Sequence, residues 1–378
     1  MFLRLYRKIS VYSKAIVLII ILLSISAPAQ AVPEQAVPDL AATAAILIES
    51  NSGRIIFQKN ADTPLPPAST SKIISAITAL DLANLSEQHQ ISAEAAQVGE
   101  SSINLQAGEI LTIDDLLKAS LIRSGNDACF ALAEAVAGDE SLFVHWLNLK
   151  AATLGATSAT LYNSNGLPIE GHQISAKNLA FIASYAMKNN YFAEVVSSKY
   201  AQIGSGSSAR KLKSTNKLLW QSDAITGIKT GTTDAAGSCL VASMQSGEMQ
   251  FISVVLHSPD RYGESLELLN YGADNYRLCR LAAAGEIVAI LPIKNSKIEY
   301  LPIQVSTDAY LLYPKENLTD LRLSWQLPLN LTAPVTDDQT IGYLMVYDSK
   351  DNQIMNVRLS AAVDASESFS LFNRLFVQ

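Results

Sequence analysis

The hydrophobic pattern of the chain changes once, near Glu286, and no other feature constrains the possible fold more. Before this point, stretches with near-helical apolar spacing, such as residues 69 to about 85, occur among short apolar stretches typical of strands. Beyond it, apolar and polar residues alternate in short segments, most clearly over residues 321–329. Because 378 residues exceed the usual size of one domain, we expect a large mixed domain followed by a small all-β domain.

In the first of these domains, predicted strands precede and follow a helical middle. The expected elements are a hairpin at 44–57, helices at 69–85, 112–122 and 127–136, strands at 226–232, 238–245 and 249–257, and a closing helix at about 264–281. In the closing helix, Leu266, Leu269 and Tyr276 would face inward. This order predicts an α/β (α+β) fold, with an antiparallel sheet flanked by helices and a helical subdomain.

The first 31 residues have the pattern of a secretory signal peptide. Four basic residues within the first fourteen precede an apolar run from Ala15 to Ile25 and small residues that end at Ala31. Cleavage is expected after Ala31, and the alternative is an uncleaved membrane anchor. In either case the mature domain would be exported, to the bacterial periplasm or the outer face of the cytoplasmic membrane.

Composition argues against several classes of function. The formal charge of -7 disfavours a nucleic-acid partner. The three cysteines, Cys129, Cys239 and Cys279, are too widely spaced for a disulfide framework or a zinc site, and we expect them to be small buried residues. The four histidines occur singly, and no G-x-S-x-G is present, so a metal enzyme or a Ser-His-Asp hydrolase is disfavoured. No metal or cofactor is expected.

One serine and one lysine lie a turn apart at the start of the first predicted helix. In Ser69-Thr70-Ser71-Lys72 the spacing puts the hydroxyl and the amine on one helix face, where a desolvated lysine can take the serine proton. The S-x-x-K pattern recurs at Ser208 and Ser214, but only Ser69 leads into an amphipathic helix. A simple helix cap is the alternative role for Ser69.

Two further motifs follow in order. Ser124-Gly125-Asn126 is one of three S-x-N matches, and it alone lies in a break between predicted helices. Lys229-Thr230-Gly231 is a unique K-T-G tripeptide in a predicted strand, where glycine permits close approach of a ligand and the strand edge can pair with an extended peptide. A twisted strand with a solvated lysine is the alternative. The ordered set S-x-x-K, S-x-N, K-T-G is the signature of penicillin-binding proteins and class A β-lactamases.

The chain resembles the low-molecular-mass penicillin-binding proteins that act as D-alanyl-D-alanine carboxypeptidases. The resemblance rests on the segments at 67–72, 124–128, 165–167, 216–219 and 227–234, and it covers most of the mature chain. It implies the penicillin-binding transpeptidase fold, peptidoglycan stem peptides as substrates and β-lactams as covalent inhibitors. It also implies a domain at 32–282, an all-β domain at 283–365 and a tail at 366–378.

The same resemblance implies a role for each matching residue. Ser69 would attack the penultimate D-alanine carbonyl, Lys72 would accept its proton, and Ser124 with Asn126 would relay protons and position the substrate. Substrate binding would involve five residues: Lys229, Thr230, Gly231, Thr232 and Arg261. The backbone N–H groups of Ser69 and Thr232 would form the oxyanion hole. Arg261 has a second possible role, as an exposed residue at the start of the next helix.

Three features depart from the family pattern. Pro168 stands where close relatives tend to have an acid, and Thr232 replaces a frequent histidine. The terminal segment is short, and Arg374 is the only cation in its apolar stretch, so it is expected either to contact a membrane surface or to form a packed or frayed tail.

Three alternative functions share this sequence pattern. A β-lactamase would need an E-x-x-L-N motif between S-x-N and K-T-G, and none is present. A non-catalytic wall-binding or β-lactam-sensing protein would not need all of the intact motif residues. Endopeptidase action on cross-links would use the same residues and remains open, because a fold does not fix which peptide fits.

Overall fold

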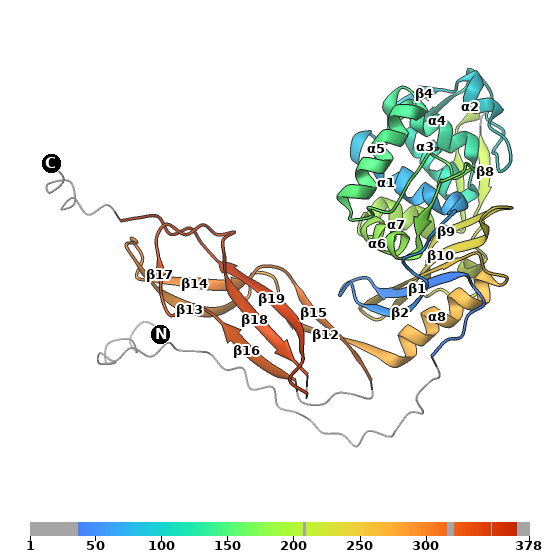
Figure 1. Ribbon diagram of the computed structural model, residues 1–378. Helices are drawn as coiled ribbons and strands as arrows, with labels where there is room; N and C mark the ends of the chain where they lie inside the picture. Colours follow the sequence, from blue (N-terminus) through green and yellow to red (C-terminus); the bar gives the residue numbers. More distant parts are fainter. Residues whose placement is uncertain (1–36, 207–208, 316–320, 349, 369–378) are drawn as a thin grey trace, which may run out of the picture. The chain divides into compact units, whose positions relative to one another are not determined.

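The computed structural model describes residues 37–206, 209–315, 321–348 and 350–368, and these form two compact units that divide between Arg277 and Leu278 (Figure 1). The predicted signal segment at 1–31 and the tail from residue 369 onward lie outside the described residues. Among the residues described, no helix is long and apolar enough to cross a membrane.

A five-stranded antiparallel sheet forms the centre of the first unit, in the order β2-β1-β11-β10-β9. Its strands are β1 (Ala44–Glu49), β2 (Ile55–Lys59), β9 (Ile225–Thr233), β10 (Gly237–Ser246) and β11 (Met249–Leu256). The predicted hairpin and the three later strands are thus confirmed. Because β9 is the last strand in the order, its outer edge pairs with no other strand in the part of the chain that the structure describes.

Both faces of this sheet are covered, which explains why β1 is apolar at almost every position. Ile46 and Ile48 belong to the core on one face, and Leu47 belongs to the core on the other. Helix α8 (Arg261–Asn275) packs on the Leu47 face, and the remaining helices lie on the opposite side (Figure 1). The sheet is therefore the middle layer of three, as the α/β (α+β) prediction requires.

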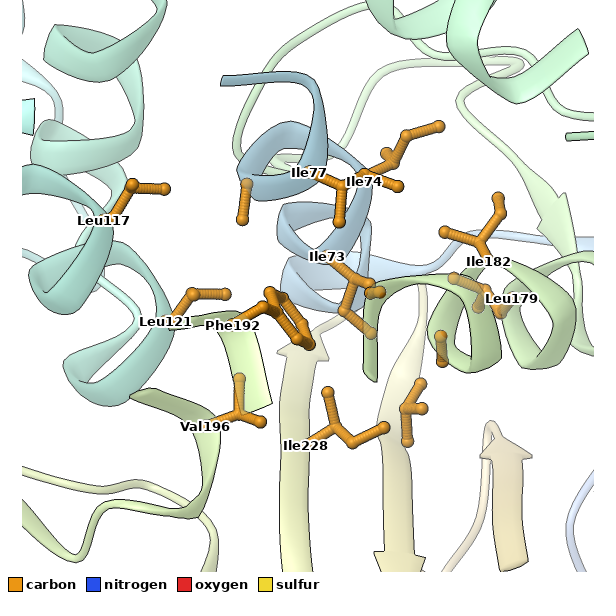
Figure 2. Close-up of a cluster of buried hydrophobic side chains, with 14 of the residues drawn as sticks. Ile73, Ile74, Ile77, Leu117, Leu121, Leu179, Ile182, Phe192, Val196 and Ile228 are labelled. Carbon is orange, nitrogen blue, oxygen red and sulfur yellow. The ribbon is translucent and has the colours of Figure 1, made fainter. Parts of the chain in front are cut away.

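The helical layer is built around α1 (Lys72–Leu82), most of which is buried. The other helices are α2 (Ala93–Gln97), α3 (Ile113–Lys118), α4 (Asn126–Ala137), α5 (Glu140–Thr153), α6 (Ala176–Met187) and α7 (Asn190–Ser197). Figure 2 shows Ile73, Ile74 and Ile77 of α1 among apolar side chains from α3, α6, α7 and β9. This packing fixes the start of α1, where the S-x-x-K motif lies.

The closing helix differs from its prediction. Helix α8 begins at Arg261 and ends at Asn275, and Tyr276 has extended backbone angles, so it begins strand β12 (Tyr276–Ala282). Its partly buried side chain nevertheless packs inward, against the same core as Leu266 and Leu269. The physical reason lies in the sequence, since Asp274 and Asn275 favour helix ends and the residues that follow alternate in burial. The predicted helix was too long, because the apolar spacing seen up to Leu269 was extended to residue 281.

The second unit contains only strands among its described residues. A six-stranded sheet has the order β16-β18-β19-β14-β13-β17, and β12 pairs with β15. The bounds are β13 (Ile287–Lys294), β14 (Tyr300–Val305), β15 (Ala309–Pro314), β16 (Arg322–Gln326), β17 (Leu331–Thr332), β18 (Thr340–Tyr347) and β19 (Gln353–Ala361). The predicted all-β character is confirmed. Cys279 is exposed, however, as is Arg280 beside it in β12, so the expectation that all three cysteines are buried was wrong.

Candidate active site

The Ser69 hydroxyl and the Lys72 amine are in direct contact. A short 3-10 turn, Ala68–Ser71 (η1), leads into α1, and Lys72 is the first residue of that helix. Lys72 Nζ donates a hydrogen bond to Ser69 Oγ at 2.7 Å. Ser69 is not a helix cap, since the cap positions of η1 and α1 are Pro67 and Ser71. Its hydroxyl is thus available for chemistry.

Lys72 is buried with an acceptor for each of its three protons. Besides Ser69, it donates to Asn126 Oδ1 and to the backbone carbonyl of Asn165, both at 2.7 Å. Burial lowers the pKa of Lys72 from 10.5 to about 8, because desolvation penalises the charged form. In the neutral amine, the two N–H groups can still donate to the oxygens of Asn126 and Asn165 while the nitrogen lone pair faces Ser69. This arrangement suits a base that takes the serine proton.

Local structure at the second motif brings its two polar side chains to the same place. A π-helical turn, Ala119–Arg123 (η2), continues α3 and ends at Ser124, whose φ of 69° reverses the chain before α4 begins at Asn126. Asn126 Nδ2 donates to the carbonyl of Gly99 at 3.0 Å, which turns its Oδ1 toward Lys72. The predicted break between helices is therefore a structural feature of the site.

Lys229 joins the third motif to the second. Its side chain extends from β9, is 1% exposed, and donates to Ser124 Oγ at 2.8 Å. Burial holds the pKa of Lys229 well below its usual value, and the positive charges of Lys72 and Arg261 lower it further. A solvated lysine on a twisted strand, the alternative considered from the sequence, does not match this burial.

Gly231 allows β9 to lie directly against the nucleophile turn. A Cβ atom at this position would lie 2.9 Å from the Pro67 carbonyl oxygen and 3.0 Å from the Ser69 nitrogen. Any larger residue would push the strand away from the Ser69 backbone. Thr230 is buried beside it, and its hydroxyl lies 2.6 Å from that of Thr215.

Arg261 reaches the same strand from the first residue of α8. Its guanidinium donates to the Gly231 carbonyl at 2.7 Å and to Thr232 Oγ1 at 2.6 Å. The cap of α8 is instead Asp260, whose side chain accepts the backbone N–H of Gly263 at 3.0 Å. All nine residues selected from the sequence thus converge on the start of α1 and the edge of β9.

Sequence reasoning missed the part of the site contributed by the backbone of the 163–167 loop. The Asn165 carbonyl accepts from Lys72, and Gly166 follows with a φ of 85°. Asn163 holds this loop, because its Oδ1 accepts the Gly166 N–H at 2.7 Å and its Nδ2 donates to the Leu167 carbonyl at 2.8 Å. The Asn-Gly-Leu segment was noticed in the sequence, but a carbonyl group has no residue-type signal.

Comparison with known proteins identifies the family. Residues 30–260, more than half of the chain, match the family described as D-alanyl-D-alanine carboxypeptidase. The chain belongs to this D-alanyl-D-alanine carboxypeptidase family. Residues 276–367 of the same chain match the C-terminal domain of penicillin-binding protein 5. The family resemblance proposed from the motifs is confirmed.

Relatives of this carboxypeptidase-family chain align over most of its length. It is 30% identical to a D-alanyl-D-alanine carboxypeptidase of Bacillus subtilis, with 83% of each chain covered. Penicillin-binding protein 5 of Haemophilus influenzae is similar in structure, with a TM-score of 0.79 and 26% identity over 88% of this chain and 99% of that one. A D-alanyl-D-alanine carboxypeptidase from Francisella tularensis gives a TM-score of 0.70 and 26% identity over 90% and 98% of the two chains.

No group of three or more histidine, cysteine or acidic residues that could hold a metal occurs among the described residues. The ionisable groups at the centre of the site are instead the two buried lysines, with Cys129 close to them. Burial raises the pKa of the Cys129 thiol, so it remains protonated, and it donates to the Ser164 carbonyl at 3.1 Å.

Replacing Gly166 tests the contribution of the loop carbonyl. In Gly166→Ala the new Cβ would lie 2.0 Å from the Ala68 carbonyl oxygen, so the loop must shift and carry the Asn165 carbonyl away from Lys72. We expect the rate of acylation by a fluorescent penicillin to fall at least tenfold. Gly155→Ala is the matched control, because its φ of 80° imposes similar strain but no atom lies within 4 Å. Equal rates in the two variants would show that the carbonyl is unimportant.

Proposed function

We propose that the chain is a serine-type D-Ala-D-Ala carboxypeptidase that removes the terminal D-alanine from peptidoglycan stem peptides through an acyl-enzyme on Ser69. One observation carries this proposal: Ser69 Oγ lies 2.7 Å from a buried amine, Lys72 Nζ, whose pKa is lowered to about 8. A serine next to such an amine can be deprotonated near neutral pH. Membership of the carboxypeptidase family supports the choice of substrate.

Acylation would follow from these positions. Ser69 Oγ attacks the carbonyl carbon of the penultimate D-alanine, and its proton passes to Lys72 Nζ. The carbonyl oxygen gains negative charge beside the backbone N–H groups of Ser69 and Thr232, and losing one such donor typically slows a reaction by about a hundredfold. The C–N bond then breaks, and the leaving D-alanine nitrogen takes up the proton from Lys72 by way of the Ser124 hydroxyl. Lys229, hydrogen-bonded to Ser124 at 2.8 Å, supports that transfer.

In deacylation a water molecule would be the nucleophile and Ser69 the leaving group. Lys72, neutral again, takes a proton from a water molecule that attacks the Ser69 ester. The shortened peptide leaves with a new carboxyl group, and Ser69 recovers its proton. This scheme needs the same base twice and uses no further group.

The edge of β9 would bind the substrate. An extended peptide can pair with the unpartnered edge of an antiparallel sheet, as β9 provides. The terminal carboxylate would lie toward Thr232 and Arg261, whose guanidinium is already directed to this strand by hydrogen bonds to Gly231 and Thr232. Thr230 and Lys229 complete the same segment.

The proposal also covers the cellular location of the protein and the bounds of its domains. The relatives are bacterial cell-wall enzymes, so export and removal of residues 1–31 would leave the mature chain in the periplasm or on the outer face of the cytoplasmic membrane. Residues 32–282 would form the catalytic domain and residues 283–365 the all-β domain. Contact of the tail at 366–378 with a membrane surface is part of the same proposal.

Labelling with penicillin tests the nucleophile. We expect a labelled penicillin to acylate the purified mature protein once per chain. Ser69→Ala should abolish the label, because among the described residues Ser69 is the one whose hydroxyl is hydrogen-bonded to Lys72. Ser214→Ala is the control, since it alters another S-x-x-K serine that leads to the exposed Lys217. Label that persists on the Ser69 variant, measured by intact mass, would refute the assignment.

The pH dependence of acylation tests the base. The neutral form of Lys72 must take the proton, and its pKa of about 8 lies below the ordinary value, so the rate should rise with pH and level off above about 8. Between pH 7 and pH 6 we expect a fall of nearly tenfold, because the neutral fraction of an amine falls about tenfold per unit well below its pKa. Stopped-flow acylation rates measure this. A rate that stays constant from pH 6 to pH 9 would exclude Lys72 as the base.

The products released from model substrates test the reaction. Incubation with a diacylated lysyl-D-alanyl-D-alanine peptide should release free D-alanine, and recovery from penicillin should be slow because the chain lacks the E-x-x-L-N motif of class A β-lactamases. Cross-linked muropeptide dimers are assayed in parallel. Faster cleavage of the dimers would favour the endopeptidase alternative, and recovery from penicillin within seconds would favour a β-lactamase.

A further inference from the structure

A two-stranded hairpin presents polar and aromatic side chains to solvent on one face, which neither the motifs nor the proposed chemistry uses. Strand β7 (Tyr200–Ile203) pairs antiparallel with strand β8 (Arg210–Lys213). Residues opposite each other in such a pair share a face of the hairpin. On the inner face, Leu212 is buried in the same core as helix α1. Four exposed residues lie on the outer face: Tyr200, Gln202, Lys211 and Lys213.

Trp220 adds a second aromatic ring to this outer face. It ends a short 3-10 turn, Lys217–Trp220 (η4), and its ring centroid lies 6.0 Å from that of Tyr200, with an angle of 84° between the rings. Lys213 Nζ lies 5.4 Å from the centre of the Trp220 ring. Tyr200 and Trp220 are 62% and 40% exposed, although aromatic side chains are buried on average. We call these two residues, with Gln202, Lys211 and Lys213, the hairpin face.

The charge around the hairpin face is opposite to that of the whole chain. Residues 195–222 include five basic residues and no acidic residue, whereas the chain has a formal charge of -7. Two of the five, Lys199 and Arg210, pair with acidic side chains. Among the described residues, no ion pair engages Lys211 or Lys213. The hairpin face therefore combines exposed aromatic rings with positive charge, which suits a partner that carries negative charge.

The hairpin continues directly into the active site. Lys213 lies two residues before Thr215, whose hydroxyl is 2.6 Å from that of Thr230 in the K-T-G motif. The N–H of Thr215 also donates to the carbonyl of Ile122 in η2. Two residues span at most about 7 Å of extended chain, so the hairpin face begins close to the strand that would bind a stem peptide. A polymer bound there would keep its peptide branches near Ser69.

We propose that the hairpin face binds the glycan strand of peptidoglycan while a stem peptide occupies β9. Sugar rings have apolar C–H faces that can pack on the rings of Tyr200 and Trp220, and polar edges that can hydrogen-bond to Gln202. Lys211 and Lys213 pair with carboxylates of the stem peptides along the strand. Because glycan and peptide are covalently joined, binding of one raises the local concentration of the other at the active site. The inference rests on the proposed carboxypeptidase function and adds recognition of the polymer to it.

Substrates with and without the glycan test the hairpin face. Short glycan strands that carry pentapeptides are compared with the same pentapeptide free of sugar, at equal pentapeptide concentration. For the natural sequence we expect kcat/KM for D-alanine release to be about threefold to tenfold higher on the strands, because exposed aromatic contacts and exposed ion pairs are each weak. In the double variant Tyr200→Ala with Lys213→Gln, the ratio of the two values should fall to about one, mainly through KM.

A double variant in the second unit is the matched control. Tyr300→Ala with Lys297→Gln removes a tyrosine of similar exposure, 60%, and an exposed lysine, and it should keep the natural ratio. Equal kcat/KM on the two substrates with the natural sequence would overturn the proposal. A preference for the strands that persists in the Tyr200 and Lys213 variant would overturn its assignment to the hairpin face.

Sedimentation with purified peptidoglycan tests binding without catalysis. We expect the natural protein to sediment with the polymer and the Tyr200 and Lys213 variant to remain largely in solution. Binding to phosphatidylglycerol vesicles that is lost in the same variant would identify an anionic lipid surface as the partner and overturn the choice of glycan. Release of D-alanine from neither substrate would count against the proposed function, whereas equal sedimentation of the natural protein and the variant would count against the hairpin face alone.

Discussion

The contact between Ser69 Oγ and Lys72 Nζ is the interaction on which the site depends. It is useful only if the amine can lose its charge, and burial provides this by lowering the pKa of Lys72 to about 8. Burial alone would leave the three donors of the ammonium unpaired, which is costly in a protein interior. The hydroxyl of Ser69, the amide of Asn126 and the carbonyl of Asn165 meet that requirement, so one set of contacts serves both stability and proton transfer.

The rest of the catalytic unit keeps this buried amine in place. The first two turns of helix α1 are buried, and Figure 2 shows Ile73, Ile74 and Ile77 packed among apolar side chains. Strand β9 approaches closely because Gly231 has no side chain, and it brings a second buried amine, Lys229, to Ser124. Burial and the nearby positive charge of Lys72 both lower the pKa of Lys229, so the second amine also favours its neutral form.

The sequence predicted the features that depend on residue type and spacing. Ser69 and Lys72 lie one turn apart, so their contact is local, whereas Ser124 could be chosen among three S-x-N matches only by its place between two helices. The carbonyl of Asn165 was not predicted, because any residue carries the same carbonyl and only the tertiary fold directs it to Lys72. The end of α8 was predicted too late, because Tyr276 continues the apolar spacing of the helix although it is the first residue of strand β12.

A direct titration of Lys72 tests the central claim. NMR of the protein with ¹³C-labelled lysine follows the Cε signal of each side chain with pH, and the signal absent from Lys72→Arg identifies Lys72. We expect a Lys72 midpoint near 8, well below the value of about 10.4 that a lysine has in a model peptide. A Lys72 midpoint at that ordinary value would mean that the amine is charged at neutral pH, and it would contradict the account of Ser69 activation.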